Sequence, residues 1–213
     1  MKSFEQYINE SIKDLPKDVY GIIVFDIDDT LLRVDTSLIA VHKRMPDGSK
    51  KRLSTEEFAK DPDTADPSKQ HLFDFREARD PERVYRSIMQ GTPIIKNLRI
   101  MDSYVAAGYD FCFLTARACE DVIKDALDKF LQRRTKTGVL QKLGSIFKKS
   151  LSHAINDVNK EYEGDTDAEK KANILRDLCD QYDRVVFVDD DMKNVRAARN
   201  LGIENLCVIK AWK

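Results

Sequence analysis

The sequence predicts an α/β fold, a doubly wound parallel sheet with a small flap or cap insertion after its first strand. Three short apolar runs, at residues 19–26, 109–114 and 184–188, each lead directly into polar residues. Amphipathic segments with helical spacing lie between and after them. Short apolar strands that alternate with helices are typical of a parallel sheet covered on both faces. The ligand site of such a sheet lies at the carboxyl ends of its strands.

The N-terminal segment differs from the pattern that follows it. Residues 1–16 are predicted to form a separate amphipathic helix, because Phe4, Ile8 and Ile12 fall on one side and Pro16 ends the pattern. Residues 17–213 are predicted to form the core domain, which begins with the strand at 19–26.

The strand–helix pattern is interrupted at residues 33–92, which we expect to form the insertion. The turn signal Pro46-Asp47-Gly48-Ser49 separates residues 37–41 from 51–53 and predicts a hairpin or flap. Residues 54–57 resemble a helix start. Residues 61–67 are rich in Asp and Pro and are predicted to be a loop.

The pattern resumes after the insertion. Apolar spacing predicts helices at 94–105, 120–134, 168–182 and 193–201, and strands at 109–114, 184–188 and 205–209. Gly108 and Gly202 are placed to end two of these helices. The intervening stretch is less regular, with a short helix near 140–147 and a strand near 151–155.

Composition restricts the class of protein. A chain of 213 residues with 42% hydrophobic and 34% charged residues is typical of one globular domain. It contains no apolar stretch of the roughly 18 to 20 residues that a membrane span requires, and no secretory signal pattern. We therefore expect no membrane association and a cytoplasmic location. The cysteines show no metal-binding spacing and are predicted to be reduced thiols: Cys112, Cys119, Cys179 and Cys207.

Charge is unevenly distributed although the net charge is only −1. Residues 129–149 contain seven basic residues and no acidic one. A second basic cluster comprises Lys43, Arg44, Lys50, Lys51 and Arg52. These clusters are interpreted either as ordinary solvated surface or as patches that attract a polyanionic substrate.

Several strand ends supply polar side chains to one edge of the predicted sheet. Asp26 and Asp28 follow the first strand, Thr115 follows another, and an aspartate run begins at Asp189. Carboxylates brought together in this way repel one another unless a cation lies among them, and Mg²⁺ is the expected ion because it prefers oxygen ligands. With Lys171 nearby, such a site suits a phosphoryl group, with an aspartate as nucleophile.

These residues resemble the four motifs of the haloacid dehalogenase (HAD) superfamily, in its phosphatase branch. The matching segments are Asp26-Ile27-Asp28-Asp29-Thr30, Leu114-Thr115-Ala116-Arg117, Lys171 within Glu169-Lys170-Lys171-Ala172, and Asp189-Asp190 followed by Asn194. The resemblance covers residues 19–32 and 93–210. It departs at Asp29, where the family often has glycine.

The resemblance implies a role for each residue. Asp26 would be the nucleophile that forms an aspartyl-phosphate, and Asp28 the general acid and then the base. Thr115 and Lys171, with Lys170 as the alternative, would hold the phosphoryl group. Mg²⁺ would be bound by Asp26, the main-chain carbonyl of Asp28 and Asp190, with Asp189 as the alternative ligand. Asn194 and Arg117 would support the site.

The substrate is expected to be a phosphate monoester, because only a phosphate ester has a leaving oxygen for Asp28 to protonate. The core is also similar to the phosphatase half of polynucleotide kinase-phosphatases, at Gly108-Tyr109-Asp110 and Val188-Asp189-Asp190. That similarity implies a nucleotide or a nucleic-acid terminal phosphate as substrate. No phosphate-binding kinase loop is present.

Three other functions remain open. One is a phosphatase for a small sugar or metabolite phosphate. A phospho-accepting receiver domain is disfavoured, because Thr115 stands where its phosphorylated aspartate would end a strand. The third is a binding or structural protein with an inactive core.

The first ten residues, Met1-Lys2-Ser3-Phe4-Glu5-Gln6-Tyr7-Ile8-Asn9-Glu10, resemble the N-terminal packing signal of internal head proteins of large tailed bacteriophages. This resemblance implies a phage origin, with the protein in the host cytoplasm or the virion interior. The alternative is a helix that docks on the core.

Overall fold

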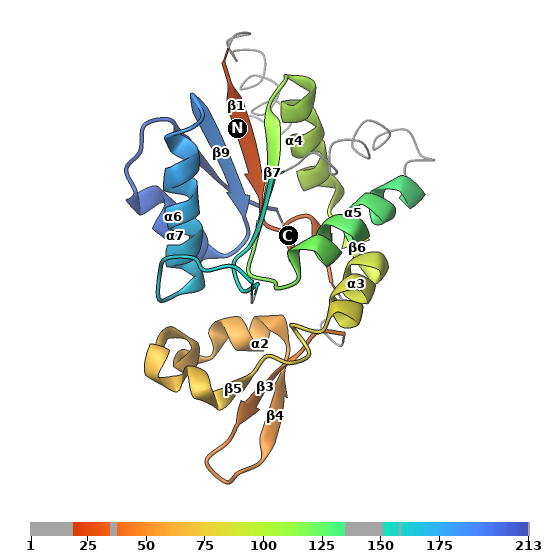
Figure 1. Cartoon of the computed structure of the whole chain (residues 1–213), viewed down its shortest axis with the longest axis vertical. Helices are drawn as coiled ribbons and strands as arrows, with labels where there is room; N and C mark the ends of the chain where they lie inside the picture. Colours follow the sequence, from red (N-terminus) through yellow and green to blue (C-terminus); the bar gives the residue numbers. More distant parts are fainter. Residues whose placement is uncertain (1–18, 35–37, 135–150, 158, 213) are drawn as a thin grey trace, which may run out of the picture.

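A five-stranded parallel sheet forms the centre of the protein (Figure 1). The computed structural model describes residues 19–34, 38–134, 151–157 and 159–212. The sheet has the order β10-β9-β1-β7-β8. Its strands are β1 (Gly21–Phe25), β7 (Asp110–Thr115), β8 (Leu151–Ala154), β9 (Arg184–Asp189) and β10 (Leu206–Lys210). Helices lie on both faces, so the predicted fold class is confirmed.

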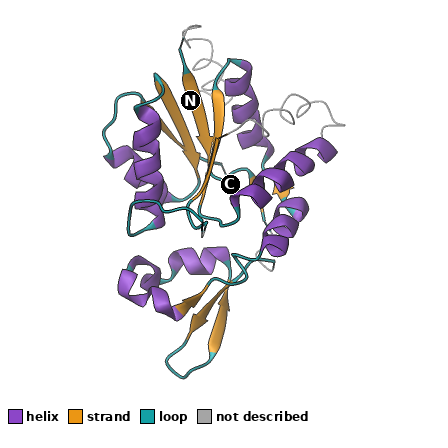
Figure 2. Cartoon of the chain, in the orientation of Figure 1, coloured by secondary structure: helices purple, strands orange, loops and turns teal. Residues whose placement is uncertain are grey.

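Strand β1 shows why the sheet is covered on both sides. All five of its residues are buried, and successive side chains of a strand point to opposite faces. Ile23 and Phe25 join the apolar cluster beneath α4 (Ile95–Ala106) and α5 (Glu120–Arg134). Ile22 and Val24 join the cluster beneath α6 (Asp167–Cys179) and α7 (Met192–Asn200). Figure 2 shows the helices flanking the strands.

The start of α6 is fixed by its sequence, and this start places Lys171. Thr166 accepts a hydrogen bond from the Glu169 main-chain N–H, and the Glu169 side chain accepts one from the Thr166 N–H, which completes a capping box. Lys171 then lies in the second turn, on the face that Ile174 and Leu175 bury against the sheet. A lysine on that face points into the protein.

The chain leaves the core through β2 (Leu32–Arg33) and returns through β6 (Thr92–Pro93), which pair antiparallel. Between them lies a three-stranded antiparallel sheet of order β4-β3-β5, from β3 (Val41–Arg44), β4 (Lys50–Leu53) and β5 (Phe73–Asp74). The same stretch contains α2 (Thr55–Lys60), the 3₁₀ helices η1 (Pro62–Ala65) and η2 (Pro67–Leu72), and α3 (Pro81–Gln90). In Figure 1 the small sheet lies beyond the carboxyl ends of the core strands.

Local predictions for this stretch needed correction. Residues 61–67 were predicted to be a loop, but they form η1 and the start of η2, because the Asp61 and Asp66 side chains cap the two turns. The first hairpin strand is Val41–Arg44 and not 37–41. Helix α3 was not predicted, although Asp80 caps it and Pro81 occupies its first turn.

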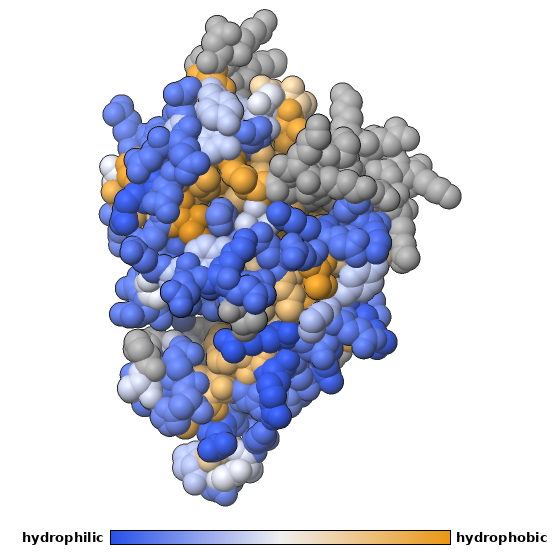
Figure 3. All heavy atoms as spheres, in the orientation of Figure 1, coloured by the Kyte–Doolittle hydropathy of each residue, from blue (hydrophilic) through white to orange (hydrophobic). Residues whose placement is uncertain are grey.

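The remaining predicted strands and helices agree with the structure to within a few residues at their ends. The predicted helices at 1–16 and 140–147 lie outside the described residues. All four cysteines are free thiols, as predicted. Within the described ranges, no helix has the length and apolarity needed to span a membrane. Figure 3 shows hydrophilic residues over most of one face of the molecule.

Candidate active site

The site lies where the connectivity of the sheet reverses. From β1 the chain first adds β7 and β8 on one side of the sheet, and then β9 and β10 on the other. Asp26 follows β1, and Asp189 ends the neighbouring strand β9. The Asp26 N–H donates to the Val188 carbonyl at 3.0 Å, which holds the two strand ends together. A crevice beside the carboxyl ends at such a reversal is the usual ligand site of an open α/β sheet.

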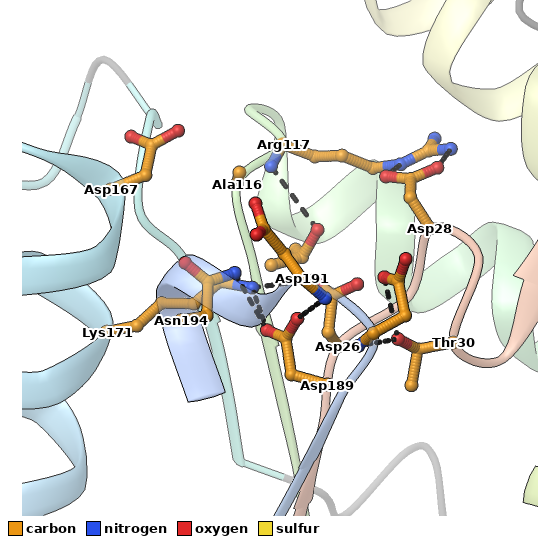
Figure 4. A network of polar contacts seen from close by, with 12 residues as sticks. Asp26, Asp28, Thr30, Ala116, Arg117, Asp167, Lys171, Asp189, Asp191 and Asn194 are labelled. Carbon is orange, nitrogen blue, oxygen red and sulfur yellow. Dashed lines mark hydrogen bonds and ion pairs between the residues drawn. The ribbon is translucent and has the colours of Figure 1, made fainter. Parts of the chain in front are cut away.

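A buried lysine joins the two strand ends (Figure 4). Lys171 Nζ donates to Asp26 Oδ1 and to Asp189 Oδ2, both at 2.8 Å. Lys171 is only 2% exposed and Asp189 is fully buried. The lysine that makes these contacts is therefore Lys171, and its neighbour Lys170 does not take part in them.

Burial and charge oppose each other in this group. Burial raises the pKa of the Asp26 carboxyl well above its usual value, Lys171 acts to lower it, and the charges of Asp189 and Asp28 raise it further. Burial alone would lower the pKa of Lys171, but the charges of Asp189 and Asp26 hold it above its ordinary value. The group thus sets two buried carboxylates, Asp26 and Asp189, against one ammonium.

The donor set fits a hard divalent cation. Carboxylate oxygens of Asp26, Asp189 and Asp190 lie within 4.8 Å of one another. When all three are ionised, Lys171 balances one of their charges and leaves two. Carboxylate oxygens are the ligands that Mg²⁺ prefers, and no soft sulfur or imidazole ligand belongs to the group. The residues present suit a magnesium ion.

Asp189 and Asp190 have different surroundings. Both oxygens of Asp189 are engaged: Oδ1 accepts from the Asp191 N–H at 2.8 Å, and Oδ2 accepts from Lys171 and from Asn194 Nδ2 at 2.9 Å. Asp190 is half-buried and accepts at Oδ1 from the Thr30 hydroxyl. Asp189 thus organises the centre, whereas Asp190 is the more exposed of the two carboxylates.

Asp28 makes a separate ion pair. Arg117 Nε and Nη2 donate to its two carboxylate oxygens at 2.7 and 2.6 Å. Arg117 is only 6% exposed, and its Nη1 donates to the Ser87 hydroxyl of α3 at 2.7 Å. Its main-chain N–H donates to Thr115 Oγ1 at 3.3 Å. The sequence indicated Arg117 only as a supporting residue, but it connects the loop after β7, the loop after β1 and the insertion.

Three further residues position the site without having been predicted to do so. The Thr30 hydroxyl donates to Asp190 Oδ1 and accepts from the Asp190 main-chain N–H. Asn97 in α4 donates to the Thr30 carbonyl at 2.7 Å, and Ser87 fixes Arg117. Thr30 lies inside the first motif, which was a usable signal. Asn97 and Ser87 act through tertiary contacts that the sequence does not show.

Asp29 has an unusual backbone conformation. Its φ is +54°, in the left-handed region that favours glycine and that Asp tolerates better than most other residues. The loop then closes with hydrogen bonds from the Leu31 and Leu32 N–H groups to the Ile27 carbonyl. A glycine at this position could adopt the same backbone conformation without strain.

Comparisons with known proteins add only a distant likeness. No protein-family model matches the chain, and no curated protein matches it. Among solved structures, the chain is similar to a HAD family hydrolase from Salmonella enterica subsp. enterica serovar Typhi, at 16% identity and a TM-score of 0.41. The match covers 100% of this chain and 78% of that one. Similarity at this level carries no inference about activity.

Proposed function

We propose that the protein is a magnesium-dependent, HAD-type phosphatase that hydrolyses a phosphate monoester through an aspartyl-phosphate. The contact that supports this most strongly is the bridge from Lys171 to Asp26 and Asp189, 2.8 Å on each side. It presents a strand-end carboxylate beside an ammonium group and two further carboxylates. With a divalent cation bound among these carboxylates, the site would suit an anionic phosphoryl group.

In the proposed reaction, a carboxylate oxygen of Asp26 attacks phosphorus and the bond to the leaving oxygen breaks. Asp28 gives that oxygen its proton. Water then attacks the phosphoryl group, Asp28 takes the proton, and the bond to Asp26 breaks to release inorganic phosphate. Thr115 and Lys171 hold the phosphoryl oxygens during both steps.

Asp26, the main-chain carbonyl of Asp28, and Asp190 would hold Mg²⁺. Asp190 is preferred over Asp189, because the oxygens of Asp189 already accept from Lys171, Asn194 and the Asp191 N–H. When bound there, Mg²⁺ would offset the charge of the phosphoryl oxygens and of the carboxylates around them.

The Asp28–Arg117 pair adds a condition to this mechanism. Both carboxylate oxygens of Asp28 accept from Arg117, so neither is free to contact a leaving oxygen. We therefore propose that the acid role of Asp28 requires this pair to open. Because Arg117 also bonds Ser87 of α3, opening is linked to the stretch between β2 and β6, which we propose acts as the cap.

For the substrate we propose a nucleotide or a nucleic-acid terminal phosphate. Support comes from the resemblance of Gly108-Tyr109-Asp110 and Val188-Asp189-Asp190 to segments of polynucleotide kinase-phosphatases, and from the basic residues of the small sheet. A small sugar phosphate is the competing substrate.

A direct assay tests the activity. Purified protein is assayed for phosphate release from p-nitrophenyl phosphate, sugar phosphates, nucleotides and oligonucleotide terminal phosphates, with Mg²⁺ and with a chelator. We expect release with Mg²⁺ only, and a loss of at least about 10³-fold in Asp26→Asn. If Asp26→Asn retains the wild-type rate, the proposed mechanism is wrong.

A further inference from the structure

A basic cavity lies on the small sheet of the insertion, outside the group of carboxylates described above. Its volume is about 370 Å³. Four permanently cationic side chains line it, against a single carboxylate: Arg44, Lys50, Arg76 and Arg79, with Asp74. Counting only these five side chains, the lining carries a formal charge of +3.

The strand register explains why these cations gather on one face. Residues directly opposite in antiparallel strands point to the same face. Arg44 pairs with Lys50, and His42 pairs with Asp74, so these side chains share a face. The next residue, Lys51, falls on the other face, where it pairs with Glu57.

The second basic cluster of the sequence therefore separates into different environments. Lys43 is neutralised by Asp61 and Asp63, at 2.7 Å from each. The Arg44 side chain makes no hydrogen bond or ion pair with any residue that the structure describes. Arg44 is thus available to a ligand in a way that Lys43 is not.

Asp74, the carboxylate that lines the cavity, is paired with two of the cations. Asp74 accepts from Arg76 Nη2 at 2.6 Å and from Lys50 Nζ at 3.3 Å, and the Arg76 guanidinium holds the pKa of Asp74 well below its usual value. It stays ionised, and it fixes two of the cations in place. The wall is completed by Arg79, whose guanidinium lies 5.5 Å from the centre of the Phe75 ring.

The cavity is connected to the candidate active site through Arg79. The Cys119 thiol donates to the Arg79 main-chain carbonyl at 3.3 Å, and Cys119 lies two residues after Arg117, which holds Asp28. One wall of the cavity therefore rests on the loop that carries Arg117.

We propose that this cavity binds a second phosphate group of the substrate, so that the enzyme prefers substrates with phosphate beyond the one it removes. This inference rests on the proposed function. The second phosphate belongs either to a bisphosphorylated small molecule or to the next phosphodiester of a strand. Guanidinium and ammonium groups bind phosphate in both cases through the same charge-assisted hydrogen bonds.

The test compares two neighbouring lysines. Lys50 and Lys51 are adjacent in β4 and have side chains 50% and 54% exposed, but only Lys50 lines the cavity. Three probes are used: p-nitrophenyl phosphate, a sugar bisphosphate, and a fluorescein-labelled oligothymidylate with a terminal phosphate. Binding is measured by anisotropy or calorimetry in the presence of a chelator, and kcat/KM is measured with Mg²⁺.

We expect Arg44→Ala/Lys50→Ala to weaken binding of the bisphosphate, of the oligonucleotide or of both by on the order of tenfold. The ratio of kcat/KM for that probe over p-nitrophenyl phosphate falls by the same factor. Lys51→Ala changes both quantities less than twofold. An effect on the bisphosphate alone identifies a small-molecule subsite. An effect on the oligonucleotide alone identifies a strand subsite, and there each removed cation lowers the salt slope of log Kd by about 0.7.

The inference is overturned if the double variant matches Lys51→Ala with every probe, even though the wild-type protein is an active phosphatase. The wild-type protein could hydrolyse none of the probes while the double variant still binds them more weakly than Lys51→Ala does. In that case the proposed activity is wrong and the proposed binding site is supported. Arg44→Glu serves as an independent variant, because Arg44 has no described partner to lose on substitution. It lowers the charge of the lining by two units, as the double variant does, and should weaken binding to a similar extent.

Discussion

The two groups of ion pairs in this protein, at the carboxyl ends of β1 and β9 and on the small sheet of the insertion, are built in opposite ways. In the core, Lys171, Asp26 and Asp189 are 2%, 6% and 0% exposed, and each charge is held by neighbours on different elements. On the small sheet, the pair of Lys50 with Asp74 is 50% and 24% exposed.

The difference in burial bears on the roles that we propose for the two regions, catalysis for the core and substrate recognition for the insertion. Removing one partner of a buried pair leaves an uncompensated charge away from water, so substitutions that break such a pair in the core should be costly to stability. Exposed pairs contribute little to stability, so charges on the small sheet can vary with the ligand. We infer that the core determines the reaction and the insertion determines which phosphate esters are accepted.

The largest effect is expected at Lys171. Lys171→Met leaves Asp26 and Asp189 as buried carboxylates without their cation, and it should lower the free energy of unfolding by about 3 to 5 kcal/mol in the absence of metal. Urea denaturation in a chelator measures this. The matched control is Lys170→Met, one residue earlier in α6, which makes neither contact. Equal stability of the two variants would contradict the assigned role of Lys171.

Arg117 is expected to have the next largest effect. Arg117→Lys keeps the charge but loses the two-pronged contact with Asp28 and the bond to Ser87, so stability should fall by about 1 to 3 kcal/mol. kcat should fall as well. Ser87→Ala, which removes only the last of these bonds, should cost about 1 kcal/mol. If Arg117→Lys has wild-type stability and kcat, the ion pair with Asp28 contributes neither to stability nor to catalysis.

A smaller effect is expected at Asp29, where φ is +54°. Asp29→Gly relieves a left-handed conformation but adds backbone entropy to the unfolded chain, so stability should change by no more than about 1 kcal/mol. Asp29→Ala lacks both the freedom of glycine and the side chain of aspartate, and it should be the less stable variant. Thermal unfolding of the two variants gives the order, and the reverse order would show that φ is not what matters here.

The smallest effect is expected for an exposed pair of the insertion. Arg86 and Glu82 in α3 form an i,i+4 pair with side chains 61% and 72% exposed. Arg86→Ala should change the free energy of unfolding by less than about 0.5 kcal/mol. A loss comparable to that of Lys171→Met would remove the contrast between the two regions.

The sequence predicted the core better than the insertion, and for a physical reason. Strands such as β1 and β9 are apolar on both faces and end in Asp, so each carries its own signal in the chain. The segment 61–72 depends on side-chain caps from Asp61 and Asp66, which resemble ordinary loop residues.

The site shows the same limit. Asp26, Asp28, Thr115, Lys171 and the run at Asp189 were visible as strand-end or motif residues. The contacts of Arg117 were not visible, because Ser87 and Asp28 are 30 and 89 residues away in the chain. Nor could the sequence separate the tasks of Asp189 and Asp190, which depend on where Lys171, Asn194 and Thr30 point.

Direct trapping of the reaction intermediate is the most decisive measurement for the central claim, that Asp26 is the nucleophile. A single turnover with Mg²⁺ and a phosphate ester carrying a labelled phosphoryl group is quenched in acid, and the peptides are analysed by mass spectrometry. We expect a labelled, hydroxylamine-sensitive phosphoryl group on the peptide that contains Asp26, and none in Asp26→Asn. Turnover with no phosphoryl group on Asp26, or with the label on another residue, would contradict it.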